Sequence, residues 1–96
     1  MTSNQKVAVV TGAGTGIGKS ASLHLLADGY SVALAGRRVQ NLEEVVVESG
    51  VSNSKVIIMP TDVGNPEDVK KLFDAIKSTY GRLDVLFNNA GIGAPR

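Results

Sequence analysis

The residues with the clearest chemical meaning form a glycine-rich segment near the amino terminus, Thr11-Gly12-Ala13-Gly14-Thr15-Gly16-Ile17-Gly18. The segment joins a short apolar run to residues with helical spacing. Loops of this type let backbone N–H groups approach a phosphate closely, and the start of the following helix favours its negative charge. The segment therefore predicts phosphate binding, because it holds more glycines than a tight turn needs.

The spacing of these glycines bears on the kind of nucleotide. The common dinucleotide fingerprint G-x-G-x-x-G does not fit, because the sixth residue counted from Gly12 is Ile17 and from Gly14 is Lys19. The pattern that fits is Thr-Gly-x-x-x-Gly-x-Gly. By itself this spacing predicts a phosphate site and leaves the nucleotide open.

A P-loop is the alternative. Ala13 to Ser20 matches G-x-x-x-x-G-K-[ST], except that alanine replaces the first glycine. In that interpretation Lys19 contacts the β- and γ-phosphates and Ser20 holds magnesium. A nucleoside-triphosphatase also needs an aspartate at the end of a later apolar strand, whereas a Pro-Thr pair separates Asp62 from the nearest such run. The P-loop is therefore the weaker interpretation.

Short apolar runs alternate with segments of helical spacing along the chain. The pattern predicts strands at 6–11, 31–35, 55–59 and 84–87, and helices at 16–28, 39–49 and 66–80. Asn65 and Pro66 are typical of a helix start. The apolar face of the first helix is expected at Ile17, Ala21, Leu25 and Leu26. The βαβαβαβ order predicts an α/β fold with a parallel sheet, in which functional loops follow the carboxyl ends of the strands.

Composition excludes several classes of function. The 96 residues suffice for one small domain, and 43% hydrophobic with 20% charged residues is typical of a folded protein. A net charge of +1 gives no electrostatic footprint for nucleic acid or an anionic membrane. With no cysteine and one histidine, His24, no metal site is expected. No apolar run is long enough for a signal segment or a membrane span, so a cytoplasmic protein is predicted.

Two further motifs follow the third and fourth predicted strands, Asp62-Val63 and Asn88-Asn89-Ala90-Gly91. Together with Thr11-Gly12-x-x-x-Gly16-x-Gly18, and in this order, they resemble the short-chain dehydrogenase/reductase family over essentially all of residues 6–96. The resemblance implies a three-layer, doubly wound Rossmann-type sheet, here partial and with strand order 3-2-1-4. It also implies an oxidoreductase that passes a hydride between a nicotinamide dinucleotide and an alcohol or carbonyl.

The resemblance implies roles for individual residues. Asp62 accepts from the adenine amino group and the Val63 backbone completes the adenine edge, although Asp62 could instead be a turn acid before a helix. The floor beneath the adenosine ribose is expected at Asn88, Ala90 and Gly91, for which ordinary turn chemistry is the alternative. The pyrophosphate turn is expected at Thr11, Gly12, Gly14, Gly16, Ile17 and Gly18.

The end of the second predicted strand bears on the choice of cofactor. In dinucleotide-binding folds an acid about 20 residues after the glycines accepts from the ribose 2′-hydroxyl, whereas an arginine accommodates the 2′-phosphate of NADP. Here the strand ends in Gly36-Arg37-Arg38, without an acid. Arg37 is expected on the 2′-phosphate and Arg38 beside the adenine, with the alternative that Arg38 only solvates a helix start. NADP is predicted in preference to NAD.

The acid/base pair of similar proteins, Tyr-x-x-x-Lys, is missing. Leu34 stands four residues after Tyr30 and Asp84 four after Tyr80, so no catalytic residue is assigned. Residues 1–96 are therefore expected to form a single partial cofactor-binding domain, catalytically incomplete and with the fourth strand at an open edge. The complete enzyme would act on an alcohol or carbonyl and form a homo-oligomer, as similar proteins do. A non-catalytic NADP-binding module or split-protein half is the alternative.

Overall fold

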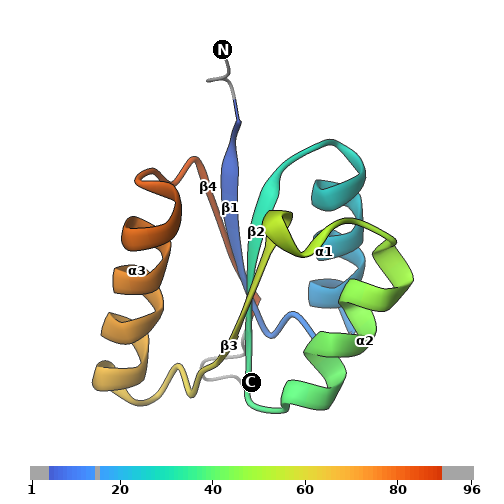
Figure 1. Cartoon of the computed structure of the whole chain (residues 1–96). Helices are drawn as coiled ribbons and strands as arrows, with labels where there is room; N and C mark the ends of the chain where they lie inside the picture. Colours follow the sequence, from blue (N-terminus) through green and yellow to red (C-terminus); the bar gives the residue numbers. More distant parts are fainter. Residues whose placement is uncertain (1–4, 15, 90–96) are drawn as a thin grey trace.

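The computed structural model describes residues 5–14 and 16–89. Strands and helices alternate along the chain, as expected (Figure 1). The elements are β1 (Val7–Thr11), α1 (Gly16–Ala27), β2 (Ser31–Gly36), α2 (Val39–Ser49), the 3-10 helix η1 (Asn53–Lys55), β3 (Val56–Pro60), α3 (Pro66–Tyr80) and β4 (Val85–Asn88).

Boundaries differ from the sequence-based expectations at a few ends. The 3-10 helix η1 was not among the expected elements, and β4 begins one residue later than expected and ends at Asn88. β3 includes Pro60, which stands opposite Gly36 in the register. Because β3 is an edge strand, a residue without an N–H is tolerated there.

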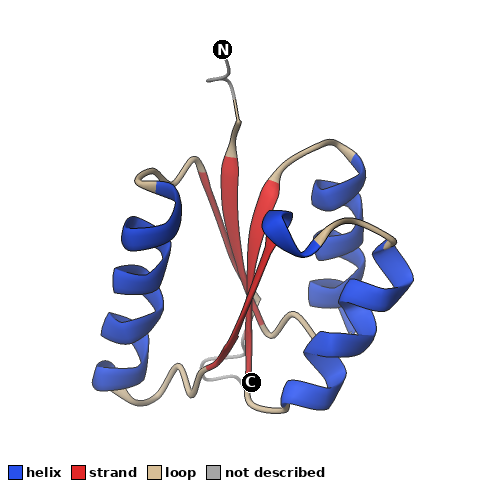
Figure 2. Cartoon of the chain, in the orientation of Figure 1, coloured by secondary structure: helices blue, strands red, loops and turns tan. Residues whose placement is uncertain are grey.

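The strands form one parallel sheet of order β3-β2-β1-β4. Figure 2 shows α1 and α2 on one face of the sheet and α3 on the other. The arrangement confirms the three-layer, partial Rossmann-type fold with strand order 3-2-1-4. It also explains the unbroken apolar runs of β1 and β2, because a central strand covered by helices on both faces has no solvent side.

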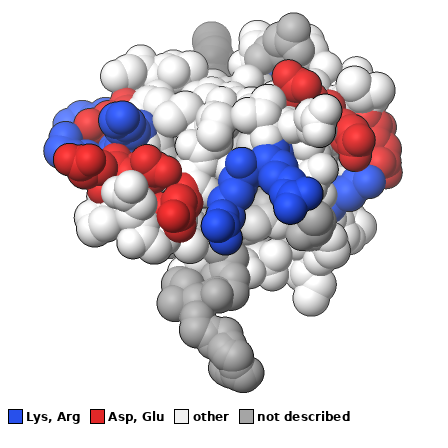
Figure 3. Space-filling model, turned by 90° about the horizontal axis from the view of Figure 1, so that it is seen from below, with Lys and Arg blue, Asp and Glu red and all other residues white. Residues whose placement is uncertain are grey.

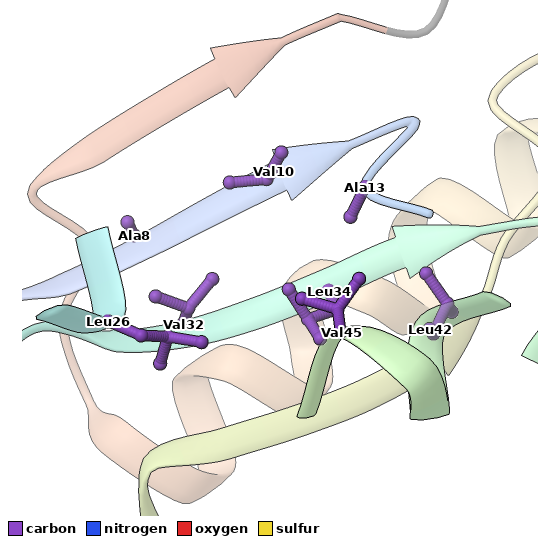
Figure 4. Close-up of a cluster of buried hydrophobic side chains, with 8 residues drawn as sticks. All are labelled: Ala8, Val10, Ala13, Leu26, Val32, Leu34, Leu42 and Val45. Atoms are coloured by element: carbon purple, nitrogen blue, oxygen red, sulfur yellow. The ribbon is translucent and has the colours of Figure 1, made fainter. Parts of the chain in front are cut away.

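Alternate residues of the strands supply two cores. The core under α1 and α2 contains strand residues such as Val10 and Leu34, and it is shown in Figure 4. The core under α3 contains Val9 and the helix residues Leu72 and Ile76. The two-residue period of β1 and β2 thus divides the apolar side chains between the helical layers.

The buried face of α1 matches the expected one at Leu26, which is buried, and at Leu25, which packs against the core, but differs at its start. Ile17 is 69% exposed, whereas the fully or nearly fully buried positions are Gly18, Ser22 and Leu26, one helical turn apart. The Ser22 hydroxyl is satisfied within the helix, because it donates to the Gly18 carbonyl over 2.8 Å. The helix therefore packs through small residues near its start, and Gly18 lies close against the Gly12 carbonyl that follows β1, while Ile17 is exposed.

β4 is held beside β1 at its amino end by a carboxylate. Asp84 Oδ2 accepts from the Val7 N–H over 2.8 Å, and the Asp84 N–H donates to the Val7 carbonyl over 2.8 Å. The Arg82 guanidinium donates to both oxygens of the same carboxylate, at 2.9 and 2.6 Å. The hydrogen bonds from Arg82 and from Val7 lower the pKa of Asp84 below its ordinary value. This clamp fixes the register that brings Asn88 to the end of β1.

The outer edge of β4 carries exposed apolar surface. Within residues 5–14 and 16–89 β4 pairs with β1 alone, and Leu86 is 54% exposed. The open edge expected from the sequence is therefore present in the described chain. None of the described helices has the length and apolar character needed to cross a membrane.

Candidate functional site

The candidate site lies at the carboxyl edge of the sheet, where the loops after β1 and β2 and the end of β4 meet. The parallel register places Thr11 beside Ala35 on one side and beside Asn88 on the other. The Ala13 N–H donates to the Ala35 carbonyl over 3.0 Å, so the glycine loop is tied to the strand that leads into Arg37. Motifs far apart in the sequence thus converge on one edge.

Two glycines of the loop have backbone conformations that favour glycine. Gly12 has a φ of 63° and Gly16 a φ of 54°. A Cβ on Gly16 would meet no atom within 4 Å, so the backbone at the start of α1 faces open space. α1 has no acidic residue in its first turn, whereas α3 begins with Glu67 and Asp68. The start of α1 is therefore compatible with an anion.

Gly18 has a different reason to be glycine. A Cβ at this position would lie 2.0 Å from the Gly12 carbonyl oxygen and 2.9 Å from Asn89 Nδ2. No side chain fits there, because the obstructing oxygen belongs to the backbone. Gly18 brings the first turn of α1 against the loop, and the loop keeps its shape through that contact.

The Thr11 hydroxyl joins the glycine loop to the end of β4. It donates to Asn88 Oδ1 over 3.0 Å and accepts from the Asn89 N–H over 2.9 Å. Asn89 Nδ2 also lies 3.5 Å from the Gly12 carbonyl oxygen. Asn88 and Asn89 therefore do more than form a turn: they fix the position of the loop. Asn89 was not among the expected site residues, and its signal was its place in the Asn-Asn-Ala-Gly motif.

Arg37 and Arg38 are both exposed at the end of β2. Figure 3 looks onto this edge of the sheet and shows basic side chains in the middle, between acidic side chains at either side. Arg38 is the N-cap residue of α2, but its side chain makes no capping hydrogen bond. The first turn of α2 contains no acid. Both guanidinium groups are thus accessible to an anion.

Asp62 is exposed and takes part in the turn before α3. Its Oδ1 accepts from the Gly64 N–H over 2.9 Å, and its own N–H donates to Asp68 Oδ2 over 2.9 Å. The turn-acid alternative thus describes what Asp62 does in this structure. The preceding Thr61 is 2% exposed and its N–H donates to the Gly36 carbonyl over 2.7 Å, which keeps this loop beside the end of β2.

Lys19 points away from the loop that a P-loop lysine would serve. Its Nζ lies 2.9 Å from Glu48 Oε1 on α2, and its side chain is 34% exposed. The hydrogen bond to Glu48, together with its charge, raises the pKa of the Lys19 amine. The ion pair thus holds the amine against α2.

The tyrosines and the histidine lie away from this site. Tyr80 ends α3, at the opposite edge of the sheet, and its hydroxyl donates to the Ser54 carbonyl over 3.4 Å. Burial raises the pKa of Tyr80, which is opposite to what a tyrosine acid/base needs near neutral pH. Tyr30 immediately precedes β2, at the same edge. His24 is exposed and bonds the Ser20 carbonyl through Nδ1, over 2.9 Å.

The remaining expected residues lie at the margin of the described chain or outside it. Val63 is half-buried in the turn before α3. Ala90 and Gly91, expected beneath the adenosine ribose, lie outside the described residues. In the described chain no group of histidine and carboxylate side chains is arranged to hold a metal ion.

Sequence comparison assigns the family. The family model for short chain dehydrogenases matches residues 6–96. This chain belongs to the short-chain dehydrogenase family. An oxidoreductase of Listeria monocytogenes whose function is uncharacterised is 42% identical over 92 residues, which cover 96% of this chain and 37% of the relative. The chain thus spans well under half the length of the curated relatives it matches.

Solved structures share the fold of this member of the short-chain dehydrogenase family. YwfH, an NADPH-dependent reductase involved in bacilysin biosynthesis, is 34% identical with a TM-score of 0.86, over 96% of this chain and 40% of YwfH. The 3-ketoacyl-(acyl-carrier-protein) reductase of Brucella melitensis, solved with NADH, is 34% identical with a TM-score of 0.82. That match covers 95% of this chain and 36% of the reductase. Both similarities confirm a partial Rossmann-type fold in an oxidoreductase family.

Proposed function

We propose that this chain binds NADP(H), in preference to NAD(H), and forms the cofactor-binding part of an oxidoreductase acting on an alcohol or carbonyl. The observation that carries the proposal is the adjacency of the glycine loop and the two arginines. The β1–β2 register and the bond from the Ala13 N–H to the Ala35 carbonyl place both at one sheet edge. A dinucleotide phosphate carries negative charge at two separated points, and this edge offers a partner for each.

The residues present fit such a cofactor. The backbone at Gly16 faces open space, and Gly12 and Gly18 keep the loop close against the start of α1. The α1 terminus favours a pyrophosphate, and Arg37 is the arginine expected on a 2′-phosphate. Asp62 and Val63 are proposed at the adenine, with Arg38 beside it. The floor beneath the adenosine ribose is proposed at Asn88, Ala90 and Gly91.

The related structures include proteins described with either cofactor, so the preference for NADP is argued from the residues of this chain. One neighbour is described as NADPH-dependent and another was solved with NADH. The exposed arginine pair after β2 favours NADP, because a carboxylate there would repel a 2′-phosphate and none is present. The side chain expected to discriminate is Arg37.

The proposed contribution of this chain is binding and orientation. A bound nicotinamide dinucleotide supplies or accepts the hydride, whereas proton transfer to the substrate needs an acid/base group. Neither tyrosine begins a Tyr-x-x-x-Lys sequence, and both lie at the opposite sheet edge. We therefore expect no turnover from the 96-residue chain alone. The alcohol or carbonyl substrate and a homo-oligomeric state are proposed for the complete enzyme, and cytoplasmic localisation is proposed on the same basis.

Calorimetric titration of the chain with NADPH, NADH and ATP with magnesium tests the proposal. NADPH should bind most tightly. Arg37→Ala should weaken NADPH binding by about tenfold or more, since a hydrogen bond to a charged group contributes about 1.5–3 kcal/mol, and it should change NADH binding little. Lys71→Ala, which removes the same charge from an exposed position on α3, is the control. Binding of ATP alone would support the P-loop instead, and an NADPH affinity insensitive to Arg37 would refute the NADP preference.

A further inference from the structure

We propose that the first turn of α2 is a positioning element that holds the two arginines in register with the glycine loop. Its contact residues are Asn41 and Leu42. In this arrangement Gly14 packs against α2. That contact fixes the position of the glycine loop, proposed for the pyrophosphate, relative to the arginines, proposed for the 2′-phosphate. The inference rests on the proposed NADP(H) function and concerns how that site is built.

The glycine loop approaches α2 most closely at Gly14 and Asn41. A Cβ on Gly14 would lie 2.6 Å from Asn41 Cβ and 3.6 Å from Leu42 Cδ2. Asn41 Cβ is attached directly to the helix backbone, so no side-chain rotation can move it away. A side chain at position 14 therefore forces either the loop or the first turn of α2 to shift.

Leu42 makes the second contact, with the end of β2. A Cβ on Gly36 would lie 3.2 Å from Leu42 Cδ2, and Leu42 is 0% exposed. Figure 4 shows Leu42 with Ala13 at the end of the buried cluster that lies toward the glycine loop. One buried side chain thus packs against Gly14 in the loop and against Gly36, the residue before Arg37.

The same turn is bonded to Arg38. The N–H groups of Asn41 and Leu42 donate to the Arg38 carbonyl at 3.1 and 3.3 Å. A shift of the turn therefore moves the backbone of the arginine pair. The loop itself is restrained on its other side, because the Ala13 N–H is bonded to the central strand β2 and Gly18 packs on the Gly12 carbonyl. A collision at position 14 should thus disturb recognition of the 2′-phosphate more than that of the pyrophosphate.

Gly14→Ala tests this relation when it is introduced into three backgrounds: Asn41, Asn41→Ala and Asn41→Gly. The first two retain the Cβ that collides, and the third removes it. Dissociation constants for NADPH and NADH are measured by calorimetry for the six proteins. With a Cβ at position 41, Gly14→Ala should lower the preference for NADPH over NADH by about tenfold, and in Asn41→Gly by less than about twofold. Comparison within each background cancels the intrinsic cost of the Asn41 replacement.

A second cycle covers the case in which Gly14→Ala does not fold. Gly36→Ala brings a methyl group against Leu42 Cδ2, and Leu42→Val removes that atom. Gly36→Ala should reduce the NADPH preference by a smaller factor, about threefold, and Leu42→Val should suppress that reduction. Circular dichroism of each variant without cofactor establishes that it is folded.

The outcomes separate this inference from the proposed function. If Gly14→Ala weakens NADPH and NADH equally, or if Asn41→Gly does not restore the preference, the positioning role of α2 is wrong while NADP binding stands. If the unchanged chain binds neither dinucleotide, the proposed function is wrong and the positioning role falls with it.

Discussion

Thr11 Oγ1 donates to Asn88 Oδ1 over 3.0 Å and thereby joins the carboxyl ends of β1 and β4. The two residues are directly opposite in the register of these strands, although 77 positions separate them in the sequence. The same hydroxyl accepts from the Asn89 N–H over 2.9 Å, and Thr11 is only 6% exposed. The buried Thr11 hydroxyl therefore fixes the edge of the site by donating one hydrogen bond and accepting another.

Thr11→Val should destabilise the chain. Valine has nearly the same shape but leaves Asn88 Oδ1 and the Asn89 N–H without this partner, which costs about 1–3 kcal/mol in the free energy of unfolding. Urea unfolding measures the change. Thr11→Ser keeps the hydroxyl and loses a buried methyl group, worth about 0.8 kcal/mol. A valine variant at least as stable as the serine variant would show that the hydroxyl is not what stabilises this edge.

Gly18→Ala should also destabilise the chain, although helix propensity alone predicts the opposite. Alanine is favoured over glycine in a helix interior by about 1 kcal/mol. The new Cβ would, however, collide with the backbone carbonyl of Gly12, so we expect a net loss of about 2–3 kcal/mol from overpacking. Thermal unfolding tests this, with Ser20→Ala on the exposed face of the same helix as the control. Equal behaviour of the two variants would mean that α1 is not held close to the loop.

The Asp84 clamp predicts a pH-dependent stability. Hydrogen bonds from Arg82 and the Val7 N–H lower the pKa of Asp84 in the folded chain below 3.8, its ordinary value. A lowered folded-state pKa stabilises the fold above the unfolded-state value, and this contribution is lost as the pH falls through the folded-state pKa. The difference in melting temperature between the unchanged chain and Asp84→Asn should thus be largest near neutral pH and shrink below about pH 4.

The control for this measurement is Asp74→Asn. Asp74 pairs with Lys70 one helical turn away, and both side chains are well exposed, at 63% and 76%. Exposed pairs of this kind contribute about 0.3–0.5 kcal/mol, so this variant should differ little from the unchanged chain. An Asp84→Asn difference that stays constant down to pH 2 would contradict an ionised clamp.

Asn65→Ala should weaken the start of α3. Asn65 Oδ1 accepts from the Glu67 N–H over 2.9 Å, and losing such a cap costs about 1 kcal/mol. Denaturant unfolding gives the free energy directly. Asn65→Asp retains an acceptor next to the positive end of the helix dipole and should stay close to the unchanged chain. If the aspartate variant loses as much free energy of unfolding as the alanine variant, Asn65 stabilises the chain through a contact other than capping.

Local chemistry made the elements of this fold predictable. Asn65 and Pro66 mark the start of α3, and the spacing of Leu72 and Ile76 identifies its buried face, because a helix start and a helical period depend on neighbouring residues alone. The buried character of β1 follows from its unbroken apolar run. The expectation for Ile17 was wrong for a non-local reason, since Gly18, which approaches Gly12, takes the buried position at the start of α1.

The sequence by itself determined the order of strands and helices, the glycine-rich loop after the first strand and the family to which these motifs belong. Those features depend on residues that are close together in the sequence, so they can be recognised without knowing which segments pack against them. Only the tertiary structure decided that Lys19 pairs with Glu48, that Thr11 bonds Asn88 and that Gly14 packs on Asn41. Each of these contacts depends on strand register and on how closely a helix packs, and these are set by many side chains at once.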